Sequence, residues 1–286
     1  MQQNIIQPFR DGLRARGRIE GQDHVIEFRY HGGRYELLPA QIDELLQWKV
    51  DLLVTLAPRA TRVAQQATSS VPILAVAVDN PVVLGFARSL ARPGGNITGI
   101  SSWGIEMVIK RLELVRELLP KVRRVGMFSN PQSIDAGEFA LRLEELGRTL
   151  GLQITLVLAE APEQFVAAFE RLKLARAEAV VVLADSLIYV HRARIAELCT
   201  QYRLPSVWGG RDYLHGGGLA SYQSDFPDMF RRAGVMADQL LKGADPAEMP
   251  FERASKFHLV VNLKAARALG LTVPRTLLLA ADEVLE

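Results

Sequence analysis

The histidines and the cysteine of this chain are not spaced for catalysis or metal binding. None of its five histidines belongs to an H-E-x-x-H pair, and the single cysteine, Cys199, rules out an intrachain disulfide and a cysteine-rich metal site. The sequence also contains no G-x-S-x-G nucleophile elbow and no G-x-x-x-x-G-K phosphate loop. It therefore predicts no catalytic residue, no metal ion and no cofactor.

Short polar side chains come directly after several apolar segments. The carboxylate of Asp185, with Ser186 beside it, suits a ligand ammonium because charge-assisted hydrogen bonds are strong. Asn130 offers both a donor and an acceptor. Asp79 or Asn80 accepts a bond from the ligand, or caps the helix that follows. Capping of the next helix is also the alternative for Asp185.

The turn after the apolar segment Asp51–Leu56 is a second candidate. Free backbone N–H groups at the start of a helix bind a carboxylate whatever the side chains are. Pro58, Arg59 and Ala60 are therefore candidate ligand contacts. Arg59 either adds a cation to this site or is a solvated arginine at the helix start.

Three aromatic side chains lie at or beside the ends of expected strands: Trp103, Trp208 and Tyr222. Aromatic walls give contact area and orientation to a flat or apolar ligand. Packing in a hinge or in the core is the alternative for each.

These residues are positioned by buried strands that alternate with amphipathic helices, a pattern that favours parallel sheets of βαβ units. The expected strands are Val25–Tyr30, Asp51–Leu56, Ile73–Val78, Asn96–Ser101, Arg124–Ser129, Leu152–Leu158, Ala179–Leu183, Ser206–Trp208, Leu219–Tyr222 and Lys256–Asn262. The expected helices include Pro8–Arg16, Leu37–Gln47, Ala60–Thr68, Pro81–Leu90, Glu106–Leu119, Ala136–Leu150, Pro162–Arg176, Tyr189–Tyr202, Asp225–Lys242 and Leu263–Leu269.

The glycine-rich stretch Ser89–Ile100 interrupts this alternation, which then restarts. A chain of 286 residues is long enough for two domains. The sequence predicts an α/β protein of two doubly wound, mostly parallel-sheet lobes joined by a hinge. One lobe comprises 1–99 plus 224–254, and the other 100–223 plus 255–286. A ligand would bind in the cleft at the carboxyl ends of the strands.

The first lobe begins with a helix, whereas a doubly wound lobe begins with a central strand. Without that strand, its neighbours would expose unpaired backbone groups in the middle of the sheet. We expect that upstream residues carrying the strand are missing from this sequence; the alternative is that another segment of the chain fills the slot.

Charge and hydropathy exclude several classes of partner. The net charge is +2 and the charged residues, 23% of the chain, are mixed throughout, so no nucleic acid is expected. No run of 18 apolar residues is present to span a membrane. The first residues lack the basic flank and apolar core of a secretion signal, so the chain as written is expected to stay in the cytoplasm.

A series of motifs carries a family resemblance from Pro8 to Glu286. They include KVDLLV, QQATSSVPI, SLARPGGNITG, KRLEL, HRARIAEL, KFHLVVNLKAARALGLTVP and ADEVLE. In this order, with near-constant spacing, they resemble the tryptophan/tyrosine-type ABC-transporter substrate-binding proteins. The resemblance implies the type I periplasmic-binding fold and hinge crossings near Ile100, Gln223 and Phe251–Phe257.

The same resemblance implies a receptor, not an enzyme, that captures a small molecule and presents it to an ABC permease. It implies a periplasmic or lipid-anchored protein outside the inner membrane. The ligand would be an amino acid or a related organic acid, gripped by loops of both lobes. Where the family carries Gly-Thr-Pro-Ala and Gly-Asp-Pro turns, this chain has Ala57-Pro58-Arg59-Ala60 and Asp79-Asn80-Pro81. The family's aromatic specificity is therefore not carried over unchanged.

Two other functions stay open from the sequence. A cytoplasmic ligand-sensing or regulatory domain would use the same cleft, and the lack of a signal favours it. An α/β enzyme that acts on a small metabolite would differ from a receptor in a turnover assay, because a receptor releases its ligand unchanged.

Overall fold

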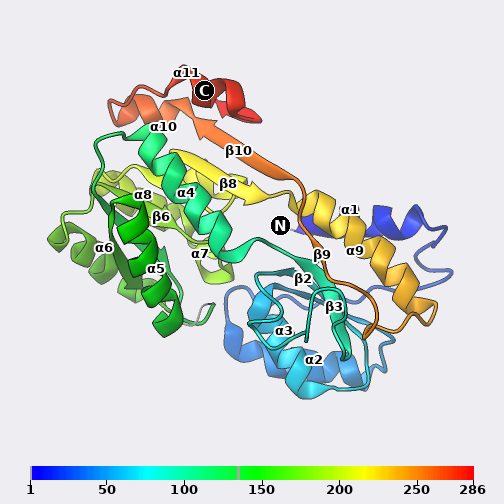
Figure 1. Cartoon of the computed structure of the whole chain (residues 1–286). Helices are drawn as coiled ribbons and strands as arrows, with labels where there is room; N and C mark the ends of the chain where they lie inside the picture. Colours follow the sequence, from blue (N-terminus) through cyan, green and yellow to red (C-terminus); the bar gives the residue numbers. More distant parts are fainter. Residues whose placement is uncertain (1, 134–135) are drawn as a thin grey trace. The chain divides into compact units, whose positions relative to one another are not determined.

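The computed structural model describes residues 2–133 and 136–286, which fold into two compact units (Figure 1). Unit 1 comprises Met1–Ile105 and Ser224–Phe257, and unit 2 comprises Glu106–Gln223 and His258–Glu286. The chain therefore passes three times from one unit to the other, after residues 105, 223 and 257. The boundaries expected from the sequence followed residues 99, 223 and 254.

Unit 1 contains short parallel strands and the helices that connect them. Its elements are α1 (Gln2–Arg14), the 3-10 helix η1 (Tyr35–Leu37), α2 (Leu38–Gln47), β1 (Leu53–Leu56), α3 (Ala57–Ala67), β2 (Ile73–Val78), β3 (Ile97–Ser101), α9 (Phe226–Leu241) and β9 (Glu252–Arg253).

The described strands of unit 1 form one sheet in the order β1-β2-β3-β9, and the paired registers are parallel. Every residue of β2 is buried. Leu74 and Val76 pack on one face, in the cluster that contains α9, while Ile73 and Ala75 pack on the other face against Ile42 of α2. A strand covered on both faces is apolar throughout, which explains why this segment shows no polar alternation.

A β-bulge interrupts the pairing of β2 with β3. The register shifts between Val76 and Val78, and Ala77 between them has a φ of 58°. A bulge re-aims the residues that follow it. Here those residues are Asp79 and Asn80, which the sequence analysis selected as candidates.

Two elements expected in unit 1 are not formed. Residues 25–30 belong to no helix or strand, and Val25 is 75% exposed. The segment 81–90 forms turns instead of a helix, with Gly85 at a φ of 68°. Alternating apolar residues predicted the strand, but its backbone has no strand beside it to complete a ladder. In the described part of unit 1, β1 is the terminal strand of the sheet on that side.

Helices α1 and α9 pack closely because glycine lies at their crossing. A Cβ atom built on Gly12 would lie 2.0 Å from the carbonyl oxygen of Arg231, and one on Gly234 would lie 2.2 Å from that of Phe9. Near the end of α9, the buried carboxylate of Asp238 is ion-paired with Arg16, Arg18 and Lys242. These contacts join the first helix of the chain to a helix that follows the second crossing.

Unit 2 contains the longer sheet. Its elements are α4 (Gly104–Leu118, which starts in unit 1), β4 (Arg124–Ser129), α5 (Ala136–Leu150), β5 (Gln153–Leu158), η2 (Pro162–Gln164), α6 (Phe165–Leu174), β6 (Ala179–Val182), α7 (Ser186–Val190), α8 (Arg192–Gln201), β7 (Ser206–Trp208), η3 (Arg211–Gly216), β8 (Ala220–Ser224), β10 (Phe257–Asn262), α10 (Leu263–Ala268), α11 (Arg275–Ala280) and β11 (Glu283–Leu285).

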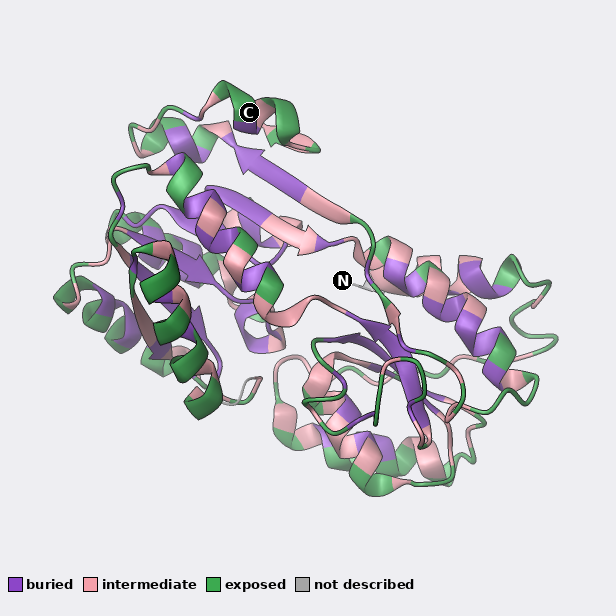
Figure 2. Ribbon diagram, in the orientation of Figure 1, coloured by how far each residue is buried: buried purple, intermediate pink, exposed green. Residues whose placement is uncertain are grey.

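The described strands of unit 2 follow the order β11-β10-β8-β7-β6-β4-β5. The registers that join β5, β4, β6, β7 and β8, and those between β10 and β11, are parallel. Buried residues line the central strands, whereas the helices alternate buried and exposed faces (Figure 2). One face of the sheet packs against α6, α7, α8 and η3 around Phe128, Phe165 and Trp208.

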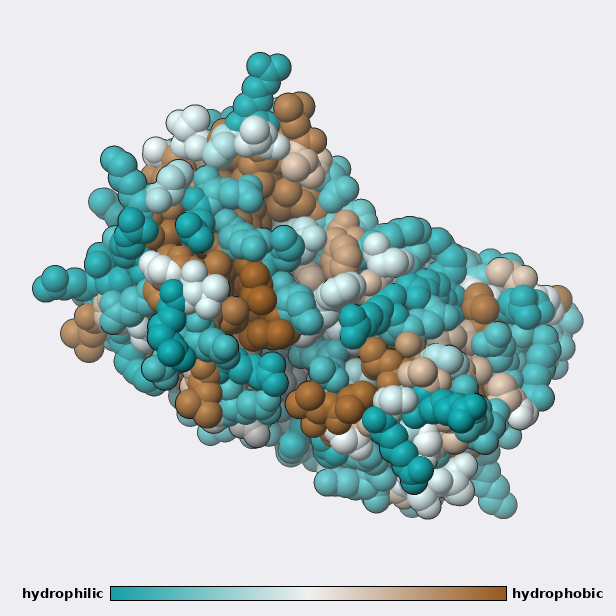
Figure 3. Space-filling model, in the orientation of Figure 1, coloured by the Kyte–Doolittle hydropathy of each residue, from teal (hydrophilic) through white to brown (hydrophobic). Residues whose placement is uncertain are grey.

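The predicted α/β class, with two mostly parallel sheets, is confirmed. Hydrophilic residues cover most of the visible surface, with small apolar areas between them (Figure 3). Among the described helices, none combines the length and the apolar character required to cross a membrane.

Candidate functional site

The clearest polar arrangement lies at the carboxyl edge of the sheet in unit 2. Asp185 follows β6 and Asn130 follows β4, the neighbouring strand. The Asn130 side-chain amide donates to Oδ1 of Asp185 at 3.2 Å, and both residues are buried. The two candidates selected from the sequence therefore lie in contact with each other.

Asp185 also caps α7. Its Oδ1 accepts hydrogen bonds from the backbone N–H groups of Leu187 and Ile188, at 2.8 and 3.2 Å. Ser186 is the first residue of this helix and is half-buried. The capping alternative considered for Asp185 is thus observed. Capping does not prevent Asp185 from binding a ligand, because the carboxylate that caps α7 lies at the carboxyl edge of the sheet.

Two tyrosines pack beside this carboxylate. The hydroxyl of Tyr213 lies 3.4 Å from the backbone oxygen of Asp185, and its ring packs edge-on against Tyr189 with centroids 5.4 Å apart. Burial raises the pKa of Tyr213, and the nearby charge of Asp185 raises it further. Tyr213 is therefore a neutral hydrogen-bonding group at neutral pH. Neither tyrosine was selected from the sequence, because Tyr189 begins the expected helix Tyr189–Tyr202 and Tyr213 lies in a short helix expected at Arg211–His215.

Arg111 brings a positive charge to the same region. It lies on the buried face of α4 with Val108 and Val115, and only 8% of its surface is exposed. Its Nε donates to the backbone oxygen of Tyr222 at 2.9 Å. The sequence analysis missed Arg111, although its spacing of three and four residues from those valines places it on an apolar helix face.

Trp208 lies in the core of unit 2. The side chain is fully buried, its indole N–H donates to Oγ of Ser206 at 2.8 Å, and its ring packs against Tyr213. Of the two roles considered for Trp208, the structure therefore shows core packing. Tyr222 is half-buried in the middle of β8, and burial raises the pKa of its phenol.

In unit 1, the candidate turn forms the start of α3. Ala57 follows β1 directly and has a φ of 69°. No side chain caps the helix, so its first N–H groups are a potential binding surface for an anion. Pro58 and Ala60 are half-buried and Arg59 is exposed. The hydroxyls of Thr55 and Thr61 hydrogen-bond to each other beneath this turn, at 2.8 Å.

Asp79 and Asn80 have different local partners. Oδ1 of Asn80 accepts from the N–H groups of Val82 and Val83, each at 3.2 Å, which is a capping geometry around a turn. Oδ1 of Asp79 accepts from the Ser102 hydroxyl at 2.7 Å. Both candidates are exposed at the carboxyl edge of unit 1.

Trp103 packs near two of the chain crossings, at the end of unit 1. Its indole N–H donates to the backbone oxygen of Ala254 at 2.6 Å. Its ring contacts that of Phe257 in a T-shaped arrangement, and the guanidinium of Arg253 lies 5.2 Å from its ring centroid. Trp103 therefore packs against residues of its own unit, and its contact with a ligand stays a prediction.

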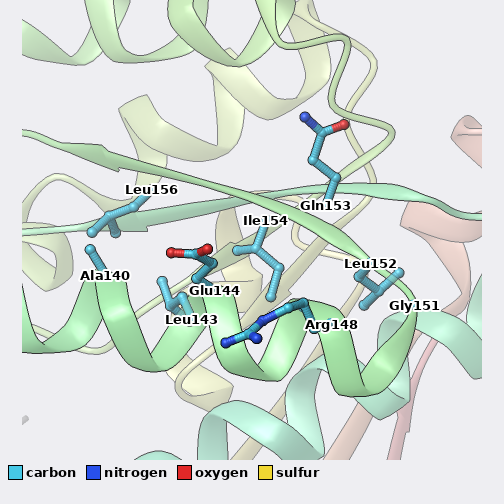
Figure 4. A pocket seen from close by; sticks show the side chains of 10 residues that line it. Ala140, Leu143, Glu144, Arg148, Gly151, Leu152, Gln153, Ile154 and Leu156 are labelled. Carbon is cyan, nitrogen blue, oxygen red and sulfur yellow. The ribbon is translucent and has the colours of Figure 1, made fainter.

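Two cavities lie beside helices of the two units. One, of about 600 Å³, lies between α5 and the amino end of β5, where Leu143, Glu144, Arg148 and Ile154 line it (Figure 4). The other, of about 300 Å³, lies between α2 and α3 and includes Arg59. Neither includes Asn130 or Asp185.

The described residues contain no cluster of three or more metal-ligating side chains. Cys199 is buried among apolar residues, and burial raises the pKa of its thiol to about 12. The thiol is therefore protonated and unreactive at neutral pH.

Comparison with known proteins agrees with this architecture. The family model described as "ABC transporter substrate binding protein" matches residues 2–285. A "Tyrosine-binding protein" from Clostridioides difficile is 22% identical over 263 residues, which are 92% of this chain and 75% of the relative.

Two solved structures are similar over nearly the whole chain. The ABC domain from Streptococcus pneumonia in complex with L-Trp is 25% identical, with a TM-score of 0.90, covering 99% of this chain and 95% of that one. A conserved domain protein from Vibrio cholerae is 24% identical, with a TM-score of 0.91 and coverages of 99% and 94%.

The fold is that of the type I periplasmic-binding proteins. The chain belongs to the family of ABC transporter substrate-binding proteins.

Proposed function

We propose that this protein is the solute receptor of an ABC importer and binds an amino acid, or a related organic acid, between its two units by hinge closure. It acts outside the cytoplasmic membrane, in the periplasm or lipid-anchored, and delivers its ligand to a membrane permease. No bond of the ligand is made or broken.

The buried Asn130–Asp185 pair at the carboxyl edge of unit 2 is the observation that supports an amino acid as the ligand. A buried carboxylate forms strong, oriented hydrogen bonds with an ammonium group. Open α/β sheets bind ligands at this edge. The related proteins named for tyrosine and L-Trp make aromatic amino acids the first ligands to test.

In unit 1, the proposed contacts are Pro58, Arg59, Ala60, Asp79 and Asn80, with Trp103 at the hinge. In unit 2 they are Asn130, Asp185, Ser186 and Tyr222. We leave out Trp208, because its indole is enclosed by the core.

Isothermal titration calorimetry against a panel of amino acids and organic acids tests this proposal. We expect one ligand bound per chain, and chromatography of the bound fraction should return the ligand unchanged. Catalytic turnover of any member of the panel would contradict a receptor and favour the enzyme alternative.

Replacing Asp185 by Asn separates its two roles. Asn also caps helices well, so α7 is retained while the negative charge is lost. We expect affinity for an ammonium-bearing ligand to fall by roughly 30-fold or more. Asp225→Asn makes the same chemical change at the cap of α9 and should leave affinity unchanged. Equal affinities for the wild type and Asp185→Asn would remove Asp185 from the site.

A further inference from the structure

The carboxyl edge of the unit 2 sheet holds buried groups of both charges. Asp185 supplies the negative charge, and Arg111 supplies the positive one. The Tyr213 phenol responds to both, since Asp185 raises its pKa and Arg111 lowers it. Tyr213 therefore lies within electrostatic range of the two charges.

The strand registers show how far apart these groups are held. Trp208 of β7 pairs with Ser221 of β8, so Gly209 and Tyr222 follow as lateral neighbours. On the other side of β7, a Cβ built on Gly209 would lie 2.7 Å from Cβ of Ala184, the residue before Asp185. The loop that carries Asp185 and the carbonyl that holds Arg111 are thus two strands apart, or about 10 Å.

The residues that follow β7 are glycines, and neighbouring groups pack closely against them. Gly209 and Gly210 follow the central strand β7, and neither has a side chain. A Cβ at Gly210 would lie 2.7 Å from Oε1 of Gln223 and 2.9 Å from the Tyr213 ring. Gln223 and Tyr213 therefore occupy the position where a side chain at Gly210 would lie, and neither glycine places a side chain between the two charged groups.

We propose that unit 2 binds both charged groups of an amino acid, with Asp185 receiving the ammonium and the Arg111 guanidinium receiving the α-carboxylate. This assignment rests on the proposed receptor function and specifies its ligand as a zwitterion. The Tyr222 carbonyl orients the guanidinium through Nε, and a guanidinium presents paired N–H groups that match a carboxylate.

The assignment replaces the expectation that the amide groups at the start of α3 take the α-carboxylate. Those amides and Arg59 then contact the rest of the ligand. Unit 2 selects the amino-acid headgroup, and unit 1 selects the side chain.

The first test uses the unaltered protein and ligands that lack one charge. Calorimetry compares L-tryptophan or L-tyrosine, whichever binds, with its amide, which keeps the ammonium, and with the matching aryl-propionic acid, which keeps the carboxylate. We expect each analogue to bind at least about 30-fold more weakly than the amino acid.

The second test assigns each charge to a residue. Arg111→Gln should weaken the amino acid about 30-fold or more but leave the affinity of the amide nearly unchanged. Asp185→Asn should show the reverse selectivity, weakening the amide and sparing the aryl-propionic acid. Arg116→Gln, at an exposed position on the same helix, is the matched control and should bind as the wild type does.

If Arg111→Gln fails to fold, Arg111→Lys is a second variant that keeps the positive charge. We expect its affinity for the amino acid to be lower than that of the wild type and higher than that of Arg111→Gln. If the wild type binds neither an amino acid nor a related organic acid, the proposed function fails as a whole; if it binds only an organic acid, the assignment of a zwitterion fails while the receptor function stands. If it binds an amino acid, but the amide binds equally well or Arg111→Gln weakens both ligands alike, only the role of Arg111 is overturned.

Discussion

Ala57 holds a backbone conformation that favours glycine, at the turn where unit 1 would receive the ligand. Its φ is 69°, and an L-residue in this left-handed region costs roughly 1–2 kcal/mol. The turn at the start of α3 is therefore strained in this chain.

Replacing Ala57 by Gly should therefore leave the free energy of unfolding unchanged or raise it by up to about 1 kcal/mol. Ala60→Gly, three residues later in α3, should lower it by about 1 kcal/mol, because glycine weakens a helix interior. Urea denaturation of both variants measures the difference. Equal destabilisation by both would show that the turn is not strained.

Asp238 makes unit 1 sensitive to acid. Its burial disfavours the charged form, but Lys242, Arg18 and Arg16 outweigh that effect and lower the pKa of its carboxyl to about 2. Because the folded pKa lies below the unfolded value, the stabilisation is present above about pH 4 and is lost as the pH falls from 4 towards 2.

Asp238→Asn should reduce stability at pH 7 by about 2 kcal/mol and flatten the dependence of stability on pH between 4 and 2. Thermal unfolding across that range measures both effects. Glu197→Gln, which removes an exposed pair with Arg194, should change stability by less than about 0.5 kcal/mol. If the stability of Asp238→Asn still falls steeply between pH 4 and 2, then other carboxylates cause the acid sensitivity.

At the scale of single residues, the sequence indicated Asn130 and Asp185 as polar residues at strand ends, and the structure places them in contact. It did not indicate that Trp208 is enclosed, because that depends on the packing of Tyr213 from η3 onto its ring. Arg111 was overlooked because a charged residue within a helix usually faces solvent. Its partner lies 111 residues away in the chain, beyond any local pattern.

At the scale of elements, the α1–α9 contact depends on two glycines. Gly234→Ala would place a methyl group against Phe9 and Gly12, and overpacking of this kind costs roughly 1–3 kcal/mol. Gly95→Ala, where a Cβ meets no atom within 4 Å, is the control and should be neutral. Chemical denaturation compares the two; a neutral Gly234→Ala would show that the helices separate without cost.

Most strands and helices were predictable because their apolar periodicity coincides with burial. The exceptions have identifiable causes. Residues 25–30 have the alternation of a strand, but strand formation requires a neighbouring backbone that the described chain does not place beside them. The segment 81–90 begins with Pro81 and follows Asn80; both residues also favour a turn, and a turn forms here. The two-residue β9 is too short to show a period.

At the scale of the whole molecule, the proposed closure has two measurable consequences. Ligand at 100 times its dissociation constant should raise the free energy of unfolding by about 2.7 kcal/mol. Small-angle X-ray scattering should record a smaller radius of gyration with ligand than without. Asp185→Asn, measured at the same ligand concentration, should show both changes reduced. Binding without compaction would contradict hinge closure.

The dependence of unit 1 on α9 also constrains how the protein is made. A ribosome releases residues 1–105 long before it reaches Phe226, so the early segment emerges without the helix that buries α1 and one face of β2. The sheet of unit 2 likewise lacks two of its strands until β10 and β11 have been synthesised. Neither unit can be completed while its first segment alone is available, so each unit completes its fold only after the segment that follows the second or third crossing has joined it.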